Sequence, residues 1–223
     1  VADLPRMLPS TCRARFLAGL LLFARLSLPA EVVVSEIMYH PSSEDIREEY
    51  VELLNTSVAA TNLTGWRLSG GVELAFSNAL TVAGAGLAPA TNLTLAPGGC
   101  LVVAANLTNF TAKYPGVTNV IGNWQGRLSN SRETIELLDA AGSRMDSVSY
   151  ADEGDWAIRQ RTPLDHGHRG WTWFAEHDGL GASLELINPS LPNNSGQNWR
   201  ASRVTNGTPG VVNSVWQAHT APF

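Results

Sequence analysis

The feature that most constrains the fold is a strand-like run at residues 49–55, followed closely by Leu63-Thr64-Gly65-Trp66. Alternate side chains of a strand point to opposite faces, so Glu49 and Glu52 lie on opposite faces of this run. Acidic residues on both faces are unusual for a half-buried strand, and Gly65-Trp66 after a polar turn indicates a second strand that opens on a buried tryptophan. We expect Tyr50 to pack, and Glu49 and Glu52 to make hydrogen bonds or ion pairs at the edge of a sheet.

The rest of the chain favours an all-β fold. It has 20 Gly and 12 Pro, and no helical apolar stripe outside its N-terminus. Asp139-Ala140-Ala141-Gly142 predicts a hairpin turn, and a short helix is expected near Phe110. We predict an immunoglobulin-like antiparallel β-sandwich of about 7–9 strands. The predicted strands include residues 32–38, 50–54, 66–68, 74–76, 100–105, 134–138, 144–150 and 183–187.

The N-terminus has the charge order of a secretory signal. Arg13 and Arg15 precede an apolar run at residues 16–23, and Leu28-Pro29-Ala30 offers a small residue for cleavage. The run is shorter than the ~20 apolar residues of a membrane span, so we favour a signal peptide and a secreted or cell-surface protein. The expected parts are a leader at 1–30 with its start at Met7, the sandwich at 31–214, and the start of a linker or a truncated end at 215–223.

The net charge restricts the class of binding partner. The chain carries a formal net charge of −5, and residues 1–30 hold four Arg and one Asp, so the mature chain would carry −8. An acidic domain is poorly suited to binding phosphate backbones, and we expect no nucleic acid partner.

Cys12 would leave with the leader, and Cys100 alone can form no internal disulfide. A domain of this length buries an adequate core without one.

A series of motifs spanning about residues 32–213 resembles the lamin tail domain family, in its secreted bacterial branch. The resemblance implies an immunoglobulin-like sandwich that is not an enzyme and serves as an accessory module on secreted or cell-surface proteins. In animals the same fold forms the tail of nuclear lamins, a role that the leader and the acidic charge argue against here. The matching residues are 35–41, 49–55, 63–68, 95–99, 101–103, 128–130, Glu133, Leu137, 139–142, 146–150, 181–186, Asn198-Trp199, Ser202, 207–210 and Asn213.

Two segments are longer than the family pattern: residues 77–94, a long loop or an extra hairpin, and residues 156–178. The second segment holds Trp171 and Trp173, which share a face if the chain is extended, with Arg169 beside them. They form either an aromatic platform for a sugar or a protein, or a cap on an open end of the sandwich. We favour the cap, because large aromatic side chains are mostly buried. Trp66, Trp124 and Trp199 are expected in the core.

The same segment carries metal-ligand residue types. His166 and His168 point the same way on a strand, and Asp165 and His177 offer further ligands. No diagnostic spacing fixes this geometry, and a polar loop is the preferred interpretation.

A group of carboxylates is of the type that binds Ca²⁺, but its spacing is not that of a calcium loop, so we favour a solvated charged loop. Asp152, Glu153 and Asp155 form a smaller set with the same ambiguity, and no cofactor is expected. The larger group comprises Glu36, Glu44, Asp45, Glu48, Glu49 and Glu52.

These observations favour a non-catalytic, secreted β-sandwich module that mediates attachment or protein interaction within a larger extracellular protein. No Ser, Cys or Thr lies in a recognisable nucleophile context, so no catalytic residue is predicted. The expected partners are another protein or downstream domains of the same polypeptide. The alternative is a carbohydrate- or divalent-cation-binding domain that uses residues 77–94 and 156–178. A weaker alternative is a metal-dependent hydrolase built on Asp165, His166, His168 and His177.

Overall fold

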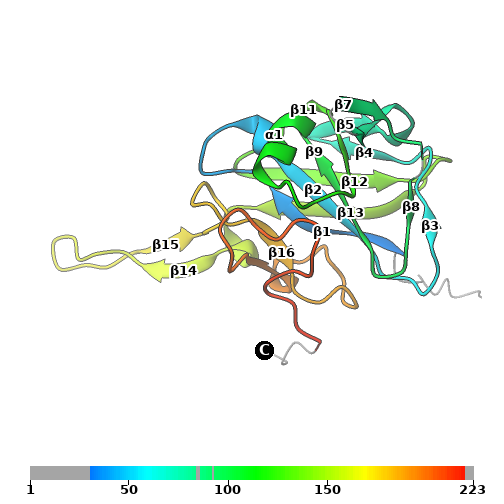
Figure 1. Ribbon diagram of the computed structural model, residues 1–223. Helices are drawn as coiled ribbons and strands as arrows, with labels where there is room; N and C mark the ends of the chain where they lie inside the picture. The colour runs from blue at the N-terminus through cyan, green and yellow to red at the C-terminus, as the bar shows by residue number, and fades with distance from the viewer. Residues whose placement is uncertain (1–30, 84–85, 92, 219–223) are drawn as a thin grey trace, which may run out of the picture.

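The computed structural model describes residues 31–83, 86–91 and 93–218, and these residues fold into two packed β-sheets (Figure 1). The larger sheet of the described residues has eight strands. In spatial order they are β17 (Trp199–Ala201), β16 (Leu184–Leu186), β1 (Val32–Met38), β2 (Tyr50–Asn55), β9 (Cys100–Ala104), β10 (Val120–Gly122), β6 (Leu80–Ala83) and β7 (Gly86–Pro89).

The smaller sheet has five strands within the described residues, and two short ladders complete the β-structure. The turn of the β12–β13 hairpin is the predicted one, with the Gly142 amide donating to the Asp139 carbonyl at 3.0 Å. In spatial order the five strands are β11 (Gln125–Gly126), β5 (Val72–Ala75), β4 (Arg67–Gly70), β12 (Arg132–Leu138) and β13 (Arg144–Ala151). The ladders are β3 (Thr61–Asn62) with β8 (Thr94–Leu95), and β14 (Ile158–Arg161) with β15 (Trp171–Phe174).

The main core lies between the two sheets. Val51 and Leu53 of β2 are fully buried in the same apolar cluster as Ile135 and Val148 of the smaller sheet. The strand alternation predicted for residues 49–55 is therefore the one that the protein uses. Trp66, Trp124 and Trp199 are also buried, at 7%, 8% and 4% exposure, as the sequence predicts.

The sandwich is confirmed, with two differences in detail. The β9–β10 pair is parallel, because the single α-helix of the described residues, α1 (Leu107–Lys113), crosses over between these strands. The strands exceed the expected number because several are two-residue ladders and because two added hairpins contribute four more. Residues 77–94 contain one of these hairpins, β6–β7, which extends the edge of the larger sheet beyond β10. The remaining helical turns are η1 (Ile46–Glu48), η2 (Phe76–Asn78), η3 (Gly154–Trp156) and η4 (Gly196–Asn198).

The outer face of the larger sheet carries a row of buried glutamates. Glu185 of β16 lies opposite Glu36 of β1, which lies opposite Glu52 of β2, and all three side chains are fully buried. The expectation of carboxylates at a sheet edge is wrong, because β2 is an interior strand. Burial, and next the neighbouring Glu52 carboxylate, raise the pKa of Glu36 above its ordinary range.

Residues 206–215, here called the C-terminal clasp, cover this glutamate row. The Thr208 amide donates to Glu36 Oε1 at 2.8 Å, and the Gly210 amide donates to Glu52 Oε2 at 2.6 Å. Glu185 accepts from the Thr208 and Ser214 hydroxyls, at 2.7 Å each. Tyr50 and Ser35 of the sheet, and Ser183 next to β16, also donate to Glu36 and Glu52, and the clasp adds further donors to these buried carboxylates. Hydrogen bonds from both sides explain why acidic residues are tolerated there.

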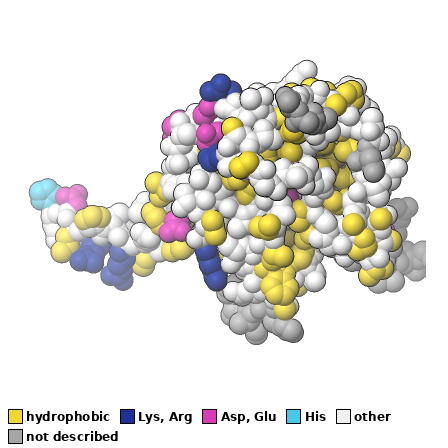
Figure 2. All heavy atoms as spheres, viewed as in Figure 1, with side chains coloured by type: hydrophobic (Ala, Val, Ile, Leu, Met, Phe, Trp, Pro, Cys, Tyr) yellow, Lys and Arg dark blue, Asp and Glu magenta, His cyan; other side chains and the backbone are white. Residues whose placement is uncertain are grey.

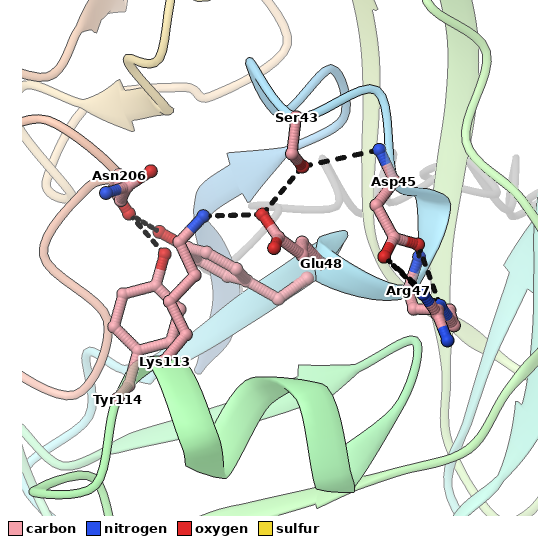
Figure 3. A network of polar contacts seen from close by, with 8 residues as sticks. Ser43, Asp45, Arg47, Glu48, Lys113, Tyr114 and Asn206 are labelled. Carbon is pink, nitrogen blue, oxygen red and sulfur yellow. Dashed lines mark hydrogen bonds and ion pairs between the residues drawn. The ribbon is translucent and has the colours of Figure 1, made fainter.

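Helix α1 joins the clasp to the loop before β2 (Figure 3). Lys113 Nζ donates to Glu48 Oε2 at 2.6 Å, and Ser43 Oγ donates to the same oxygen at 2.8 Å. The Tyr114 hydroxyl donates to the Asn206 carbonyl at 2.7 Å. These contacts close the outer face of the sheet around a second apolar cluster, which includes Phe110.

The leader predicted at residues 1–30 lies outside the described residues. Among the helices of the described residues, none has the length and apolar character needed to cross a membrane.

Candidate functional site

The β14–β15 hairpin projects from the side of the sandwich as a separate two-stranded ribbon (Figure 1). Its tip is a two-residue turn in which the Asp165 and His168 backbones exchange hydrogen bonds of 2.9 and 2.8 Å. The central residues, His166 and Gly167, have φ of 45° and 84°. Positive φ at both positions is the type I′ geometry that matches the twist of the flanking strands, and Gly167 adopts it without strain.

The base of the hairpin is fixed to the sandwich through His177. This side chain is 2% exposed, and its Nε2 lies 2.8 Å from the Trp156 carbonyl, which can only accept, so Nε2 carries the proton. Nδ1 then accepts from the Tyr39 hydroxyl at 2.7 Å. Burial lowers the pKa of His177, which keeps the ring neutral. His177 therefore connects both ends of the hairpin to Tyr39, which directly follows β1.

One face of the hairpin alternates arginine and tryptophan. Arg159 lies opposite Trp173 and Arg161 lies opposite Trp171, and residues opposite each other in an antiparallel pair share a face. The guanidinium carbons of Arg159 and Arg161 lie 4.7 and 5.0 Å from the Trp171 ring centroid. Such stacking is a cation–π interaction, and it orients both guanidinium groups on this face. We call these four residues the Arg–Trp face.

The Arg–Trp face is open to solvent. Trp171 and Trp173 are 51% and 44% exposed, and both arginines are exposed. Figure 2 shows basic side chains along one side of the projecting hairpin, next to hydrophobic ones. Residues 157–174 contain three Arg and one Asp, in a chain of net charge −5. The hairpin is thus a local basic region on an acidic protein, and it carries two solvent-exposed tryptophan rings.

A groove of about 670 Å³ runs along the base of the hairpin. Trp173 and Arg159 of the Arg–Trp face line it together with Arg200 and Arg203, which lie on and just after the edge strand β17. Asp155 and Glu176 also contribute to its wall. The groove continues the Arg–Trp face toward the edge of the larger sheet, so a bound chain has room to extend past the hairpin.

The expected cap formed by Trp171 and Trp173 is wrong. The preference for burying aromatic rings describes an average, and these rings lie on a hairpin that leaves the sandwich instead of covering its end. Arg169 is exposed just before β15. Arg159 and Arg161 were not among the site residues predicted from the sequence. The pattern Arg-Gln-Arg before the turn and Trp-Thr-Trp after it is the signal that pairs them.

The four residues of the metal hypothesis are not brought together. Asp165, His166 and His168 lie at the exposed tip, whereas His177 is buried at the base with both ring nitrogens hydrogen-bonded. His166 Nε2 lies 3.7 Å from Asp165 Oδ1, with both side chains at least 90% exposed. Across residues 31–83, 86–91 and 93–218, no group of three or more His, Cys, Asp and Glu is arranged to hold a metal.

The carboxylates considered as calcium ligands do not form one cluster either. Glu36, Glu49 and Glu52 are buried, whereas Glu44 is exposed. Asp45 instead pairs with Arg47, at 2.7 Å, and Glu48 pairs with Lys113. The smaller set is divided as well: Glu153 pairs with Arg132 at 3.0 Å, and Asp155 lines the groove at the base of the hairpin.

Cys100, the one cysteine among the residues that the structure describes, is unsuited to nucleophilic chemistry. Cys100 is partly buried on β9, and burial followed by the charge of Glu52 raises the pKa of its thiol well above the usual range. A thiol in this environment forms little thiolate, which is the reactive species.

Comparison with known proteins adds one finding. The family model described as Lamin Tail Domain matches residues 27–152, more than half of the chain. No curated protein matches it. The family match covers β1 through β13, which is the smaller sheet and all of the larger sheet except β16 and β17. It ends before the hairpin begins at β14.

Proposed function

Because the chain belongs to the lamin tail domain family, we propose that it is a non-catalytic interaction module that binds a protein partner through its β14–β15 hairpin. The observation that carries this proposal is the Arg–Trp face. Exposing two tryptophans costs the free energy that their burial would have released, on the order of 2 kcal/mol each. Trp and Arg are also the residue types that contribute most of the binding energy in protein interfaces.

The rest of the molecule supports the role of a scaffold. The clasp donates to the buried glutamate row, and His177 fixes the base of the hairpin. A rigid sandwich that presents a projecting element loses little entropy when that element binds. Function on such a fold is located in the site that the scaffold carries.

The module is further proposed to act outside the cell, after removal of residues 1–30. This part rests on the order of basic, apolar and small residues in the sequence. N-terminal sequencing of the protein collected outside its own cells checks it. The expected mature N-terminus lies near Glu31, and protein retained in the cell with its leader attached contradicts it.

Affinity capture with paired tryptophan variants tests the interaction role. The tagged full chain is compared with Trp171→Ala/Trp173→Ala in extracts of its own cell envelope and culture fluid. Trp216→Ala is the matched control, because Trp216 is equally exposed, at 51%, but lies next to the C-terminal clasp. We expect partners that are retained by wild type and by the control and lost from the double variant. Identical recovery by all three proteins contradicts the proposal.

A carbohydrate ligand is the second candidate, and the same two exposed rings favour it. Aromatic platforms also stack against the apolar faces of sugars. A glycan array with wild type and the tryptophan double variant distinguishes this candidate. Glycan binding that needs both tryptophans would support it.

A further inference from the structure

Among the described residues, no strand pairs with the outer edge of β14. The Thr162 amide donates to the Gly170 carbonyl at 3.1 Å, so residues 162 and 170 form a hydrogen-bonded pair. Hydrogen-bonded pairs alternate along an antiparallel ladder, so Gln160 and Ile158 also point their backbone groups toward β15. The amides and carbonyls of Arg159 and Arg161 therefore point away from β15. Within the described residues the hairpin is a two-stranded sheet, and no third strand pairs with this edge.

The arginines and the free backbone groups have the same period. Arg159 and Arg161 are two residues apart on β14, so their side chains repeat at roughly 6.5–7 Å along one face. A peptide added alongside β14 as a third strand has this same repeat, with alternate side chains next to the arginines. Acidic residues at alternate positions of such a peptide would each meet a guanidinium group, while its backbone pairs with the edge.

The charge distribution favours a short acidic segment over a long polyanion. Residues 157–174 are basic, but the whole chain carries −5, so a long polysaccharide or nucleic acid would extend onto a repelling surface. An extended peptide of about eight residues is limited to the hairpin and the groove at its base. Trp171 stacks on both guanidinium groups and restricts their rotamers, which reduces the entropy lost on ion pairing.

We propose that the hairpin binds an extended acidic peptide, with Asp or Glu at alternate positions, which adds as a third strand to the free edge of β14. The proposal rests on the hairpin being the interaction surface. In it, Arg159 and Arg161 recognise the acidic side chains, the edge of β14 pairs with the peptide backbone, and Trp171 positions the two arginines.

The first test measures binding of a fluorescein-labelled (Glu-Thr)₄ peptide to the full chain by fluorescence anisotropy. Arg159→Glu/Arg161→Glu is compared with Arg67→Glu/Arg144→Glu, which makes the same charge change on exposed arginines of the smaller sheet. We expect the hairpin reversal to weaken binding about tenfold or more, and the control reversal to change it less than about twofold. Equal affinity for both variants would overturn the proposal.

The second test asks whether the peptide adds as a strand. A set of (Glu-Thr)₄ peptides, each N-methylated at one residue, is titrated against wild type. Strand addition predicts an alternating pattern, because only every second peptide amide faces β14. Uniform tolerance of methylation along the peptide overturns strand addition even if binding depends on charge.

A third arm separates this inference from the proposed function. Polygalacturonate is tested as an acidic polysaccharide in the same assay. Binding of polygalacturonate without binding of the peptide overturns the peptide inference and leaves the hairpin as the interaction surface. Partner capture that survives loss of Trp171 and Trp173 overturns the proposed function itself, whatever the peptide does.

Discussion

Replacing Gly207 with Ala should destabilise the fold through the glutamate row. Gly207 has φ of +82°, and a methyl group built on it would overlap Glu36 Oε1 and the Tyr50 hydroxyl and lie 2.6 Å from Ser183 Oγ. These are the atoms that hold the clasp to the sheet. Tyr50 and Ser183 donate to Glu36 Oε1 at 2.7 and 2.6 Å, next to the Thr208 amide.

The size of the effect follows from three terms. An L-residue in the left-handed region costs about 1–2 kcal/mol, and this cost applies to any such glycine. Overpacking a filled site costs about 1–3 kcal/mol more, and each buried hydrogen bond lost as the clasp moves away costs a similar amount. We therefore expect Gly207→Ala to lower the free energy of unfolding by roughly 3–6 kcal/mol, a large part of the ~5–15 kcal/mol typical of a domain.

Gly142→Ala is the matched control. Gly142 has the same φ of +82°, but no atom lies within 4 Å of its added methyl group, so only the backbone term applies. Urea unfolding followed by far-UV circular dichroism gives both free energies. We expect a loss of about 1–2 kcal/mol for Gly142→Ala. A Gly207→Ala variant that is already unfolded in water supports the argument. A loss no greater than that of Gly142→Ala would refute it.

The remaining predictions concern burial and charge. Trp124→Ala should cost about 3–5 kcal/mol in urea unfolding, whereas Trp171→Ala should stay within about 0.5 kcal/mol of wild type, because only the first ring is buried. His177→Ala leaves the Tyr39 hydroxyl and the Trp156 carbonyl without their hydrogen-bond partner. We expect the free energy of unfolding to fall by about 2–4 kcal/mol and amide exchange at the hairpin base to become faster. Unchanged exchange would contradict the role of His177 in fixing the base of the hairpin. Burial raises the pKa of Glu49 from 4.5 to about 7, so the folded protein binds this proton more tightly than the unfolded chain does. The protonated Glu49 therefore contributes to the free energy of unfolding fully below pH 4.5, and the contribution is lost as the pH rises through 7. The free energy of unfolding of wild type should therefore fall relative to Glu49→Gln between pH 5 and about 8, and parallel pH profiles exclude the effect.

The strands could be predicted because their sequence patterns are local. Residues 134–138 and 144–150 alternate around a turn whose residues favour a hairpin, and the structure pairs them as β12 and β13. The apolar run at 32–38 and the run at 49–55 likewise become β1 and β2. In each case the period and the turn residues are contained within about 20 residues of sequence.

The environment of the acidic residues could not be predicted from such patterns. Glu36 and Glu52 are tolerated in the middle of a sheet in part because Thr208 and Gly210, which lie 172 and 158 residues further along the chain, donate to them. No local pattern indicates that pairing. The carboxylates appeared in the sequence to be solvated or at an edge because the donors come from a distant segment.

The candidate site was only partly predictable for a related reason. Trp171 and Trp173 were identified, but whether they face the core or water depends on where the hairpin leaves the sandwich. His177 and Tyr39 decide that direction, and they are distant in sequence. Arg159 and Arg161 join the site through the β14–β15 register, which pairs them with Trp173 and Trp171. The Asp165–His168 bridge at the turn is offset by one residue from that register, so the turn residues alone do not predict the pairing.

Removing the hairpin tests the central claim most directly. Ile158 and Phe174 are directly paired, so replacing residues 159–173 with Asn-Gly closes the strands with a two-residue turn. Because β14 is exposed throughout, the free energy of unfolding of this variant should stay within about 1 kcal/mol of wild type. The account predicts that this folded variant captures none of the partners retained by wild type. Undiminished capture by the folded variant would contradict the claim that the hairpin is the binding surface.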